Sequence, residues 1–196
     1  MSELGRPLPQ EFYARPADRL APALLGTVLA VHSEQGTAMG RIVETEAYVG
    51  EEDLACHAAK GLTQRTTVLY GPAGTAYLYL IYGMYDLFNV VAAPEGVPHA
   101  VLIRAVELLQ GPLNGARGDG PGRLTRALGI DRSLNGTSLL GPRLTIHPGR
   151  APATITVTPR VGVAYAGAWA DAKLRFLDAD SRAVSRPSPR SIGRPA

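Results

Sequence analysis

The chain has 196 residues, of which 45% are hydrophobic and 19% are charged, so we expect a single domain with an ordinary packed core. The formal net charge of +3 favours polyanionic partners only mildly. One cysteine, Cys56, excludes an internal disulfide and a cysteine-rich metal site, and the lack of a long apolar run excludes a membrane-spanning helix.

The first elements are expected to be a helix followed by a strand. Residues 17–31 have Asp18 as a plausible N-cap and apolar residues at helical spacing, which predicts a short amphipathic helix. Alternating polar and apolar residues then predict a strand over residues 40–48. The acidic and then mixed segment 50–60 is expected to form a loop or a short helix.

The centre of the chain is rich in tyrosine and in residues that favour strands. Two such runs flank Tyr82-Gly83 within residues 74–91, which predicts a β-hairpin with a glycine turn. A third apolar run, residues 100–103, predicts a strand that ends at Arg104.

Two further elements are expected in the last third of the chain. Leu124 and Leu128 follow Pro121 at helical spacing, so a helix should begin near this proline. The alternation in residues 154–158 predicts another strand. Short strands mixed with a few helices, without regular βαβ alternation, favour an α+β domain.

The two ends of the chain also carry information. Residues 181–196 contain four arginines and no acidic residue. Their Ser/Pro/Arg composition predicts a flexible basic tail next to a domain that spans residues 1–180. The first ten residues lack the basic and then apolar pattern of a secretory signal, so a cytoplasmic protein is expected.

The strand predicted over residues 40–48 places two acids and a tyrosine at alternate positions. Alternate residues of a strand share a face, so Glu44, Glu46 and Tyr48 should project to the same side. Two interpretations fit this pattern, a solvated sheet surface with incidental acids or a site with acid–base chemistry. The two acids also permit a carbohydrate hydrolase that uses both carboxylates, but that alternative leaves the tyrosines and the basic tail unexplained.

Five of the eight tyrosines lie between residues 70 and 85. Tyr77 is explained by ordinary sheet packing, because tyrosine is a good strand former. Tyr82 lies at the expected turn, where insertion of the ring between stacked bases explains a large side chain better than packing does. His57, Asn89 and Arg104 stand beside apolar runs, which fits satisfied buried groups as well as a functional site.

An ordered series of motifs runs from about residue 12 to about residue 177. The series comprises RIVETEAY at 41–48, His57, the Tyr-rich segment 74–89, VLIRA at 101–105, GPGRL at 120–124, RVGV at 160–163 and LRF at 174–176. In this order the motifs resemble the alkyladenine (3-methyladenine) DNA glycosylase family. The resemblance implies a single α+β domain with a curved, largely antiparallel sheet, flanking helices and a protruding Tyr-rich β-hairpin.

The resemblance also implies a function in base excision repair. The protein would be a monomeric enzyme that flips alkylated purines out of double-stranded DNA and hydrolyses their N-glycosidic bond. Substrates would be of the 3-methyladenine class, with hypoxanthine and ethenoadenine as further candidates. Such an enzyme would be cytoplasmic and would associate with the nucleoid when it is on DNA.

Individual roles follow from the same resemblance. Glu46 would activate a water molecule that Arg104 and the carbonyl of Val161 help to hold. Tyr82 would fill the gap left in the duplex, and Arg123, at a position where vertebrate members have a lysine, would contact the DNA backbone. The pocket around the flipped base would be lined by Tyr48, His57, Tyr79 and Asn89, of which Asn89 would oppose the exocyclic amine of guanine.

Two observations bear on cofactors and on the type of reaction. His32, His99 and His147 lack a second His or Cys at metal-ligand spacing, so neither a metal nor another cofactor is expected. Only Lys60 and Lys173 offer an amine nucleophile, and neither lies in the matched catalytic segments, so a monofunctional glycosylase is expected. A non-catalytic protein that binds damaged DNA, and that needs no general base, is the alternative.

Overall fold

A computed structural model describes residues 4–111 and 116–187 of the chain. The strands are β1 (Val28–Ser33), β2 (Gly36–Tyr48), β3 (Ala76–Ile81), β4 (Tyr85–Ala92), β5 (His99–Gln110), β6 (Leu144–His147), β7 (Ile155–Thr158) and β8 (Arg175–Asp178). The helices are α1 (Gln10–Tyr13), α2 (Ala17–Leu24), α3 (Pro121–Leu128) and the 3-10 helices η1 (His57–Lys60), η2 (Thr67–Tyr70), η3 (Arg132–Leu134) and η4 (Gly167–Ala170).

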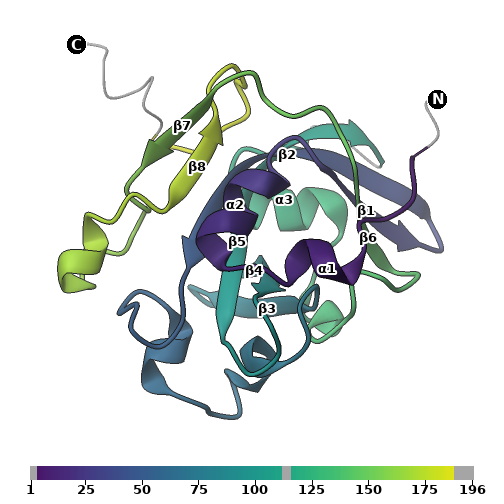
Figure 1. Cartoon of the computed structure of the whole chain (residues 1–196). Coiled ribbons are helices and arrows are strands. Elements are labelled where there is room, and N and C mark those ends of the chain that lie inside the picture. The colour runs from purple at the N-terminus through teal and green to yellow at the C-terminus, as the bar shows by residue number, and fades with distance from the viewer. Residues whose placement is uncertain (1–3, 112–115, 188–196) are drawn as a thin grey trace, which may run out of the picture.

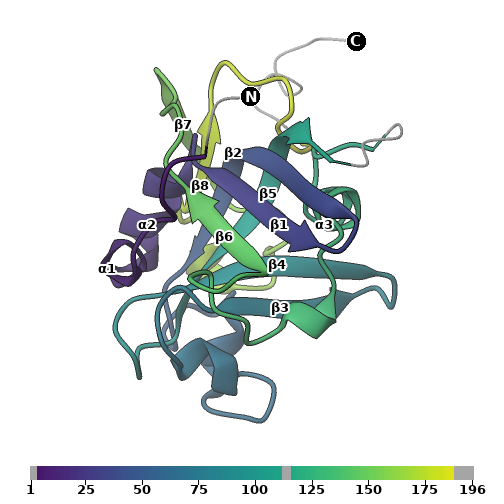
Figure 2. The same cartoon turned by 90° about the vertical axis from the view of Figure 1, so that its right-hand side faces the viewer.

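All described strands belong to one curled antiparallel sheet in the order β3-β4-β5-β2-β1-β6 (Figure 1). The long strand β2 is its centre, because one edge of β2 pairs with β5 while the other edge pairs first with β1 and then with β8. Strand β7 pairs only with β8. Figure 2 shows α1 and α2 on one side of the sheet and α3 on the other, as expected for an α+β domain.

The second half of β2 is buried on both faces, so its polar side chains are kept away from solvent. Val43, Thr45 and Ala47 are fully buried, and the hydroxyl of Thr45 donates a hydrogen bond of 2.9 Å to the carbonyl of Ala21 in α2. The opposite face carries Glu44 and Glu46, which are fully buried as well. The interpretation of this face as a solvated sheet surface is therefore wrong.

The helix predicted over residues 17–31 is correct only in its first half. The helix α2 ends at Leu24, and residues 28–31 lie in β1, where the backbone pairs with β2 on one edge and β6 on the other. Gly26 separates the two elements with a φ of +85°, and a side chain there would collide with the backbone carbonyl of Arg150. Sheet pairing on both edges thus outweighs the helical spacing of the apolar residues.

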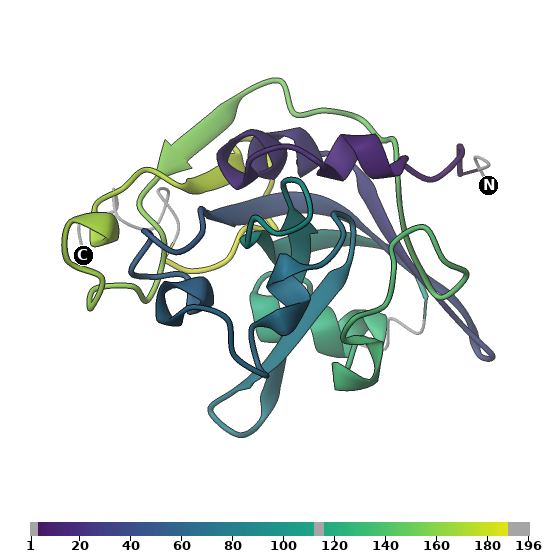
Figure 3. The ribbon, with the colours of Figure 1, turned by 60° about the horizontal axis from the view of Figure 1, so that its bottom comes forward.

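The strands predicted over residues 40–48, 100–103 and 154–158 are confirmed as β2, β5 and β7, and β2 and β5 are longer than expected. The helix predicted near Pro121 is confirmed as α3. Strand β3 pairs with β4, and the amide of Met84 donates to the carbonyl of Ile81 at 3.2 Å across the connecting turn. Tyr82 and Gly83 both have positive φ there, as in a type I′ turn. In Figure 3 this turn lies at the lower edge of the molecule.

The segment predicted to be a flexible tail is packed in its first part. Ser181 and Ser185 are buried, and the hydroxyl of Ser181 donates to Glu107 at 2.6 Å. The backbone amide of Ser185 donates to Glu44 at 2.5 Å. Residues 181–187 therefore pack against the sheet, beyond the boundary expected at residue 180. Residues 188–196 of the predicted tail lie outside the described part of the chain.

No helix within the described residues is both long enough and apolar enough to span a bilayer.

Candidate active site

A cavity of about 620 Å³ opens between the β3–β4 pair, the start of α3 and the loop after β7. This volume lies within the range of about 300–1,000 Å³ that is typical of small-ligand sites. The residues on its wall include Tyr48, His57, Tyr77, Tyr79, Tyr82, Tyr85, Asn89, Arg104, Arg123, Val161, Tyr165, Ser185 and Arg186. Eight of the nine site residues predicted from the sequence are in this set, and the ninth, Glu46, lies behind the wall. Among the described residues, no group of three His, Cys, Asp or Glu side chains could hold a metal ion.

Glu46 is held in a fixed orientation by two hydrogen-bond donors and one ion-pair partner. Its Oε1 accepts a hydrogen bond from the backbone N–H of Val161 at 2.7 Å and lies 3.4 Å from Nη1 of Arg104. Its Oε2 accepts a hydrogen bond from the hydroxyl of Tyr48 at 2.9 Å. All three partners line the cavity, so the buried carboxylate is directly behind the part of the wall that they form.

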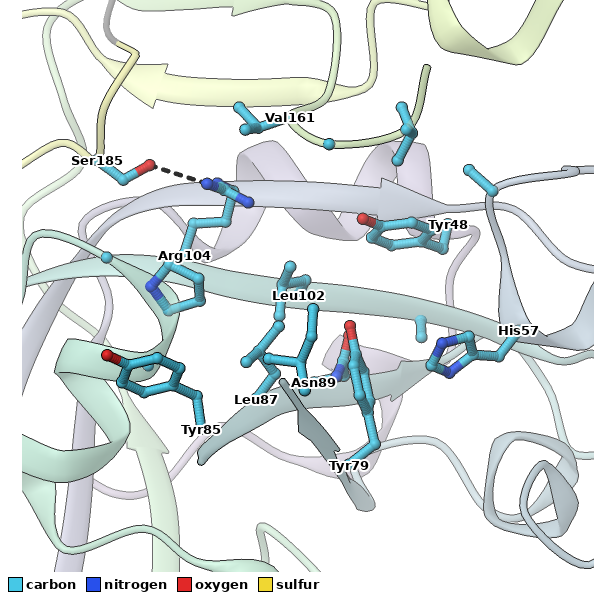
Figure 4. A pocket seen from close by; sticks show the side chains of 18 of the residues that line it. Tyr48, His57, Tyr79, Tyr85, Leu87, Asn89, Leu102, Arg104, Val161 and Ser185 are labelled. Carbon is cyan, nitrogen blue, oxygen red and sulfur yellow. Dashed lines mark hydrogen bonds between the residues drawn. The ribbon is translucent and has the colours of Figure 1, made fainter. Parts of the chain in front are cut away.

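Tyr48 combines a polar contact with an aromatic surface. Burial, together with the negative charge of Glu46, raises the pKa of Tyr48 well above its ordinary value, so its hydroxyl remains a donor. The guanidinium of Arg160 lies 4.7 Å from the centre of the Tyr48 ring. Tyr48, which is labelled in Figure 4, thus contacts a fixed cation and also lines the cavity.

Arg160 and Asp53 form a buried ion pair to which the sequence analysis assigned no role. Nη1 and Nη2 of Arg160 donate to the two carboxylate oxygens of Asp53, at 2.5 and 2.8 Å. Both side chains are fully inaccessible to solvent. Nη1 of Arg160 also donates to the carbonyl of Ala47 at 2.8 Å. These bonds fasten the chain just before Val161 to the end of β2, which places the Val161 amide at Glu46. Only the motif that begins at Arg160 pointed to this region.

His57 and two tyrosines form an aromatic corner of the cavity. His57 Nδ1 lies 2.9 Å from the hydroxyl of Tyr77, and its ring centre is 4.5 Å from that of Tyr79. Burial lowers the pKa of His57 to about 4, and the charges of Arg65 and Lys60 act in the same direction. The imidazole is thus neutral at neutral pH and offers an uncharged face to a ligand. Tyr77 is buried, as its sheet position predicted.

Asn89, Tyr82 and Arg123 take separate positions around the cavity. Asn89 is opposite Tyr77 in the β3–β4 pairing, donates to its carbonyl at 3.2 Å and lies near Leu102 at the centre of Figure 4. Tyr82 is at the rim, and 83% of its surface is exposed. Nη1 of Arg123 lies 3.1 Å from Asp119, and its side chain is half-exposed.

Glu44, the second acid of β2, has a full set of partners. Its Oε1 accepts hydrogen bonds from Nε of Arg104, Nε of Arg175 and the hydroxyl of Ser185, each at 2.8 Å. A carboxylate with this many donors, away from the cavity wall, is poorly placed to react with a ligand. The alternative of a carbohydrate hydrolase that uses Glu44 and Glu46 as its pair therefore finds no support in the geometry.

Comparisons with known proteins agree with the resemblance seen in the sequence. The family model for methylpurine-DNA glycosylase (MPG) matches residues 11–182. A protein of Myxococcus xanthus is 52% identical over 96% of this chain and 98% of its own length. A protein of Legionella pneumophila (strain Lens) is 49% identical over 92% and 99%, and one of Methanocella arvoryzae is 44% identical over 94% and 98%. All three names describe candidate 3-methyladenine DNA glycosylases. The chain belongs to the methylpurine-DNA glycosylase family.

Proposed function

We propose that this protein is a DNA-3-methyladenine glycosylase, a hydrolase of N-glycosyl bonds that removes alkylated purines in base excision repair. Family membership supports the class of reaction. One observation carries the mechanism: the buried carboxylate of Glu46, oriented by Tyr48, Arg104 and Val161, lies behind the wall of a cavity rich in aromatic residues.

The cavity would receive a base that has left the duplex. A stacked base is out of reach of a buried carboxylate, so the enzyme must extrude it at a cost of a few kcal/mol. Tyr48, His57 and Tyr79 offer ring surfaces on which a purine can stack. An alkylated purine with a positive charge gains additional attraction to tyrosine rings and needs little acid catalysis to leave. Asn89 would oppose the exocyclic amine of a normal guanine.

Glu46 would then promote hydrolysis. Cleavage of the N-glycosidic bond builds positive charge on the sugar, which a nearby carboxylate stabilises while it also deprotonates the attacking water. Arg104 and the carbonyl of Val161 would hold that water, and both residues already combine contact with Glu46 and a place on the cavity wall. Arg123, at the start of α3 on the same wall, would contact the DNA backbone.

The reaction should stop at an abasic site. Formation of a Schiff base requires an amine nucleophile. Lys60 and Lys173 are exposed, and neither lies on the wall of the cavity. We therefore expect no strand cleavage, and no covalent adduct with DNA after reduction with borohydride.

Release of free bases from methylated duplex DNA tests the proposal. We expect free 3-methyladenine and alkali-labile abasic sites, with hypoxanthine and ethenoadenine duplexes as comparisons and undamaged DNA as the control. Tight binding of the lesion duplexes without release of any base would favour the alternative, a non-catalytic protein that binds damaged DNA.

A Tyr82→Ala variant should excise bases from duplex DNA about ten- to a hundredfold more slowly, because the loss of a stacking ring costs about 1–3 kcal/mol. Excision of the same lesion from single-stranded DNA should change little, since no gap has to be filled there. Met84→Ala is the matched control, as Met84 is also exposed and follows Tyr82 in the same turn. Equal losses of excision rate on duplex and single-stranded DNA would show that Tyr82 does not fill the gap in the duplex.

A further inference from the structure

The guanidinium of Arg104 has a different partner for each of its three nitrogens. Nε donates to Glu44 at 2.8 Å, Nη2 donates to the hydroxyl of Ser185 at 3.1 Å, and Nη1 lies 3.4 Å from Glu46. A guanidinium is planar and rigid, so anchoring two of its nitrogens restricts where the third can lie. The two contacts away from Glu46 therefore limit where Arg104 holds Nη1.

Ser185 joins both of these contacts with a single hydroxyl group. Its Oγ donates to Glu44 at 2.8 Å and accepts from Nη2 of Arg104 at 3.1 Å, as shown by the dashed line in Figure 4. Its backbone amide donates to the other carboxylate oxygen of Glu44 at 2.5 Å. Ser185 is 2% exposed and lines the cavity beside Arg104.

The backbone around Ser185 is fastened by a second arginine. Arg175 comes from β8, and its Nε donates to Glu44 at 2.8 Å. Its Nη2 donates to the carbonyls of Ser185 and Pro187, at 3.4 and 2.9 Å. Since β8 pairs with β2 at residues 44–46, this anchor is built on the same strand that carries Glu46. The segment 181–187, which we call the strap, is thereby held against the back of the active site.

We propose that Ser185, alone among the serines of the strap, is a positioning residue for base excision. Ser185 orients the guanidinium of Arg104, which in turn orients Glu46. This inference rests on the proposed function, because it assigns Glu46 to the reaction. Loss of the hydroxyl would leave Nη2 of Arg104 without its acceptor and remove one donor from Glu44, so that Arg104 could turn away from Glu46.

The test compares Ser185→Ala with Ser181→Ala. Both serines are buried in the strap and donate their hydroxyl to a glutamate, but the glutamate of Ser181 is Glu107, which pairs with Arg41 and not with Arg104. We expect Ser185→Ala to lower the single-turnover excision rate about tenfold, as a misplaced catalytic group does. Affinity for duplex DNA with an uncleavable tetrahydrofuran abasic site should change by less than about twofold. Ser181→Ala should match the wild type in both measurements.

Two further variants separate positioning from simple destabilisation. Ser185→Thr retains the hydroxyl and should recover most of the rate. In an Arg104→Lys background, which already lacks the guanidinium fork, Ser185→Ala should lower the rate by less than about twofold, because residues that act through one another are not additive. Rates are normalised to the active fraction, titrated with the abasic duplex.

The outcomes distinguish this inference from the function on which it rests. Wild type that releases methylated purines establishes the function. A Ser185→Ala rate equal to wild type, an equal loss in Ser181→Ala, or a loss confined to DNA affinity would then overturn the role of Ser185 alone. A wild type that releases no base would overturn both.

Discussion

A Glu46→Gln variant is expected to lose base excision by about a hundred- to ten-thousandfold, the range typical of removing a general base. Glutamine has the size of glutamate and can still accept the hydrogen bond from the backbone N–H of Val161. It carries no charge, so it neither deprotonates water nor stabilises the positive charge on the sugar. Because the ring surfaces around the cavity and Tyr82 are unchanged, binding to lesion duplexes should persist.

Single-turnover excision and equilibrium binding on the same duplex check this expectation. Glu107→Gln is the matched control, because Glu107 is also paired with an arginine, Arg41, but lies in a part of β5 away from the cavity wall. A Glu46→Gln rate within about tenfold of wild type, or about 1.4 kcal/mol in the barrier, would show that Glu46 is not the base.

An Asp53→Ala variant should lower the free energy of unfolding by about 3–5 kcal/mol, because it leaves a buried guanidinium without its counter-ion. Arg160 is fully inaccessible, and its Nε already lacks a partner. Asp53 also accepts hydrogen bonds from the amides of Val49 and Ala55, so the loop after β2 would lose its anchor. Since the same pair places Val161, excision should also fall.

Urea unfolding at neutral pH measures the first effect. Asp18→Ala is the control, because Asp18 is 3.9 Å from Arg19 in an exposed pair and should contribute no more than about 1 kcal/mol. A loss below about 1 kcal/mol for Asp53→Ala would mean that water or a shifted side chain compensates Arg160, and the buried pair would then not be what holds the loop.

Sequence patterns predicted the elements whose conformation depends on the preferences of neighbouring residues. The alternation of β2, the Tyr82-Gly83 turn and the proline at the start of α3 each express a conformational preference of a few neighbouring residues. The spacing of residues 28–31 predicts a helix, and nothing nearby in the chain reveals that two other strands pair with them. Strands β6 and β8 are missing from the sequence prediction, and they pair with β1 and β2, whose residues lie more than a hundred positions away in the chain.

Family motifs located the candidate site residues, but not what holds them. The contact between Glu44 and Ser185 spans 141 positions, and that between Asp53 and Arg160 spans 107. Each side chain in these pairs is compatible, by itself, with an exposed position. Only the pairing of β8 with β2 and the return of the chain after β7 bring the partners together, away from water.

By itself, the sequence determined the class of domain, the family and the places where short-range preferences are strong, because these depend on residue type and on spacing along the chain. The tertiary structure alone decided that both faces of the second half of β2 are buried, that Glu46 lies behind the cavity wall while Glu44 is bonded away from it, and that residues 181–187 pack against β2 and β5. The physical reason is that charged groups can be buried only beside partners, and here several of those partners come from strands and loops more than a hundred residues away.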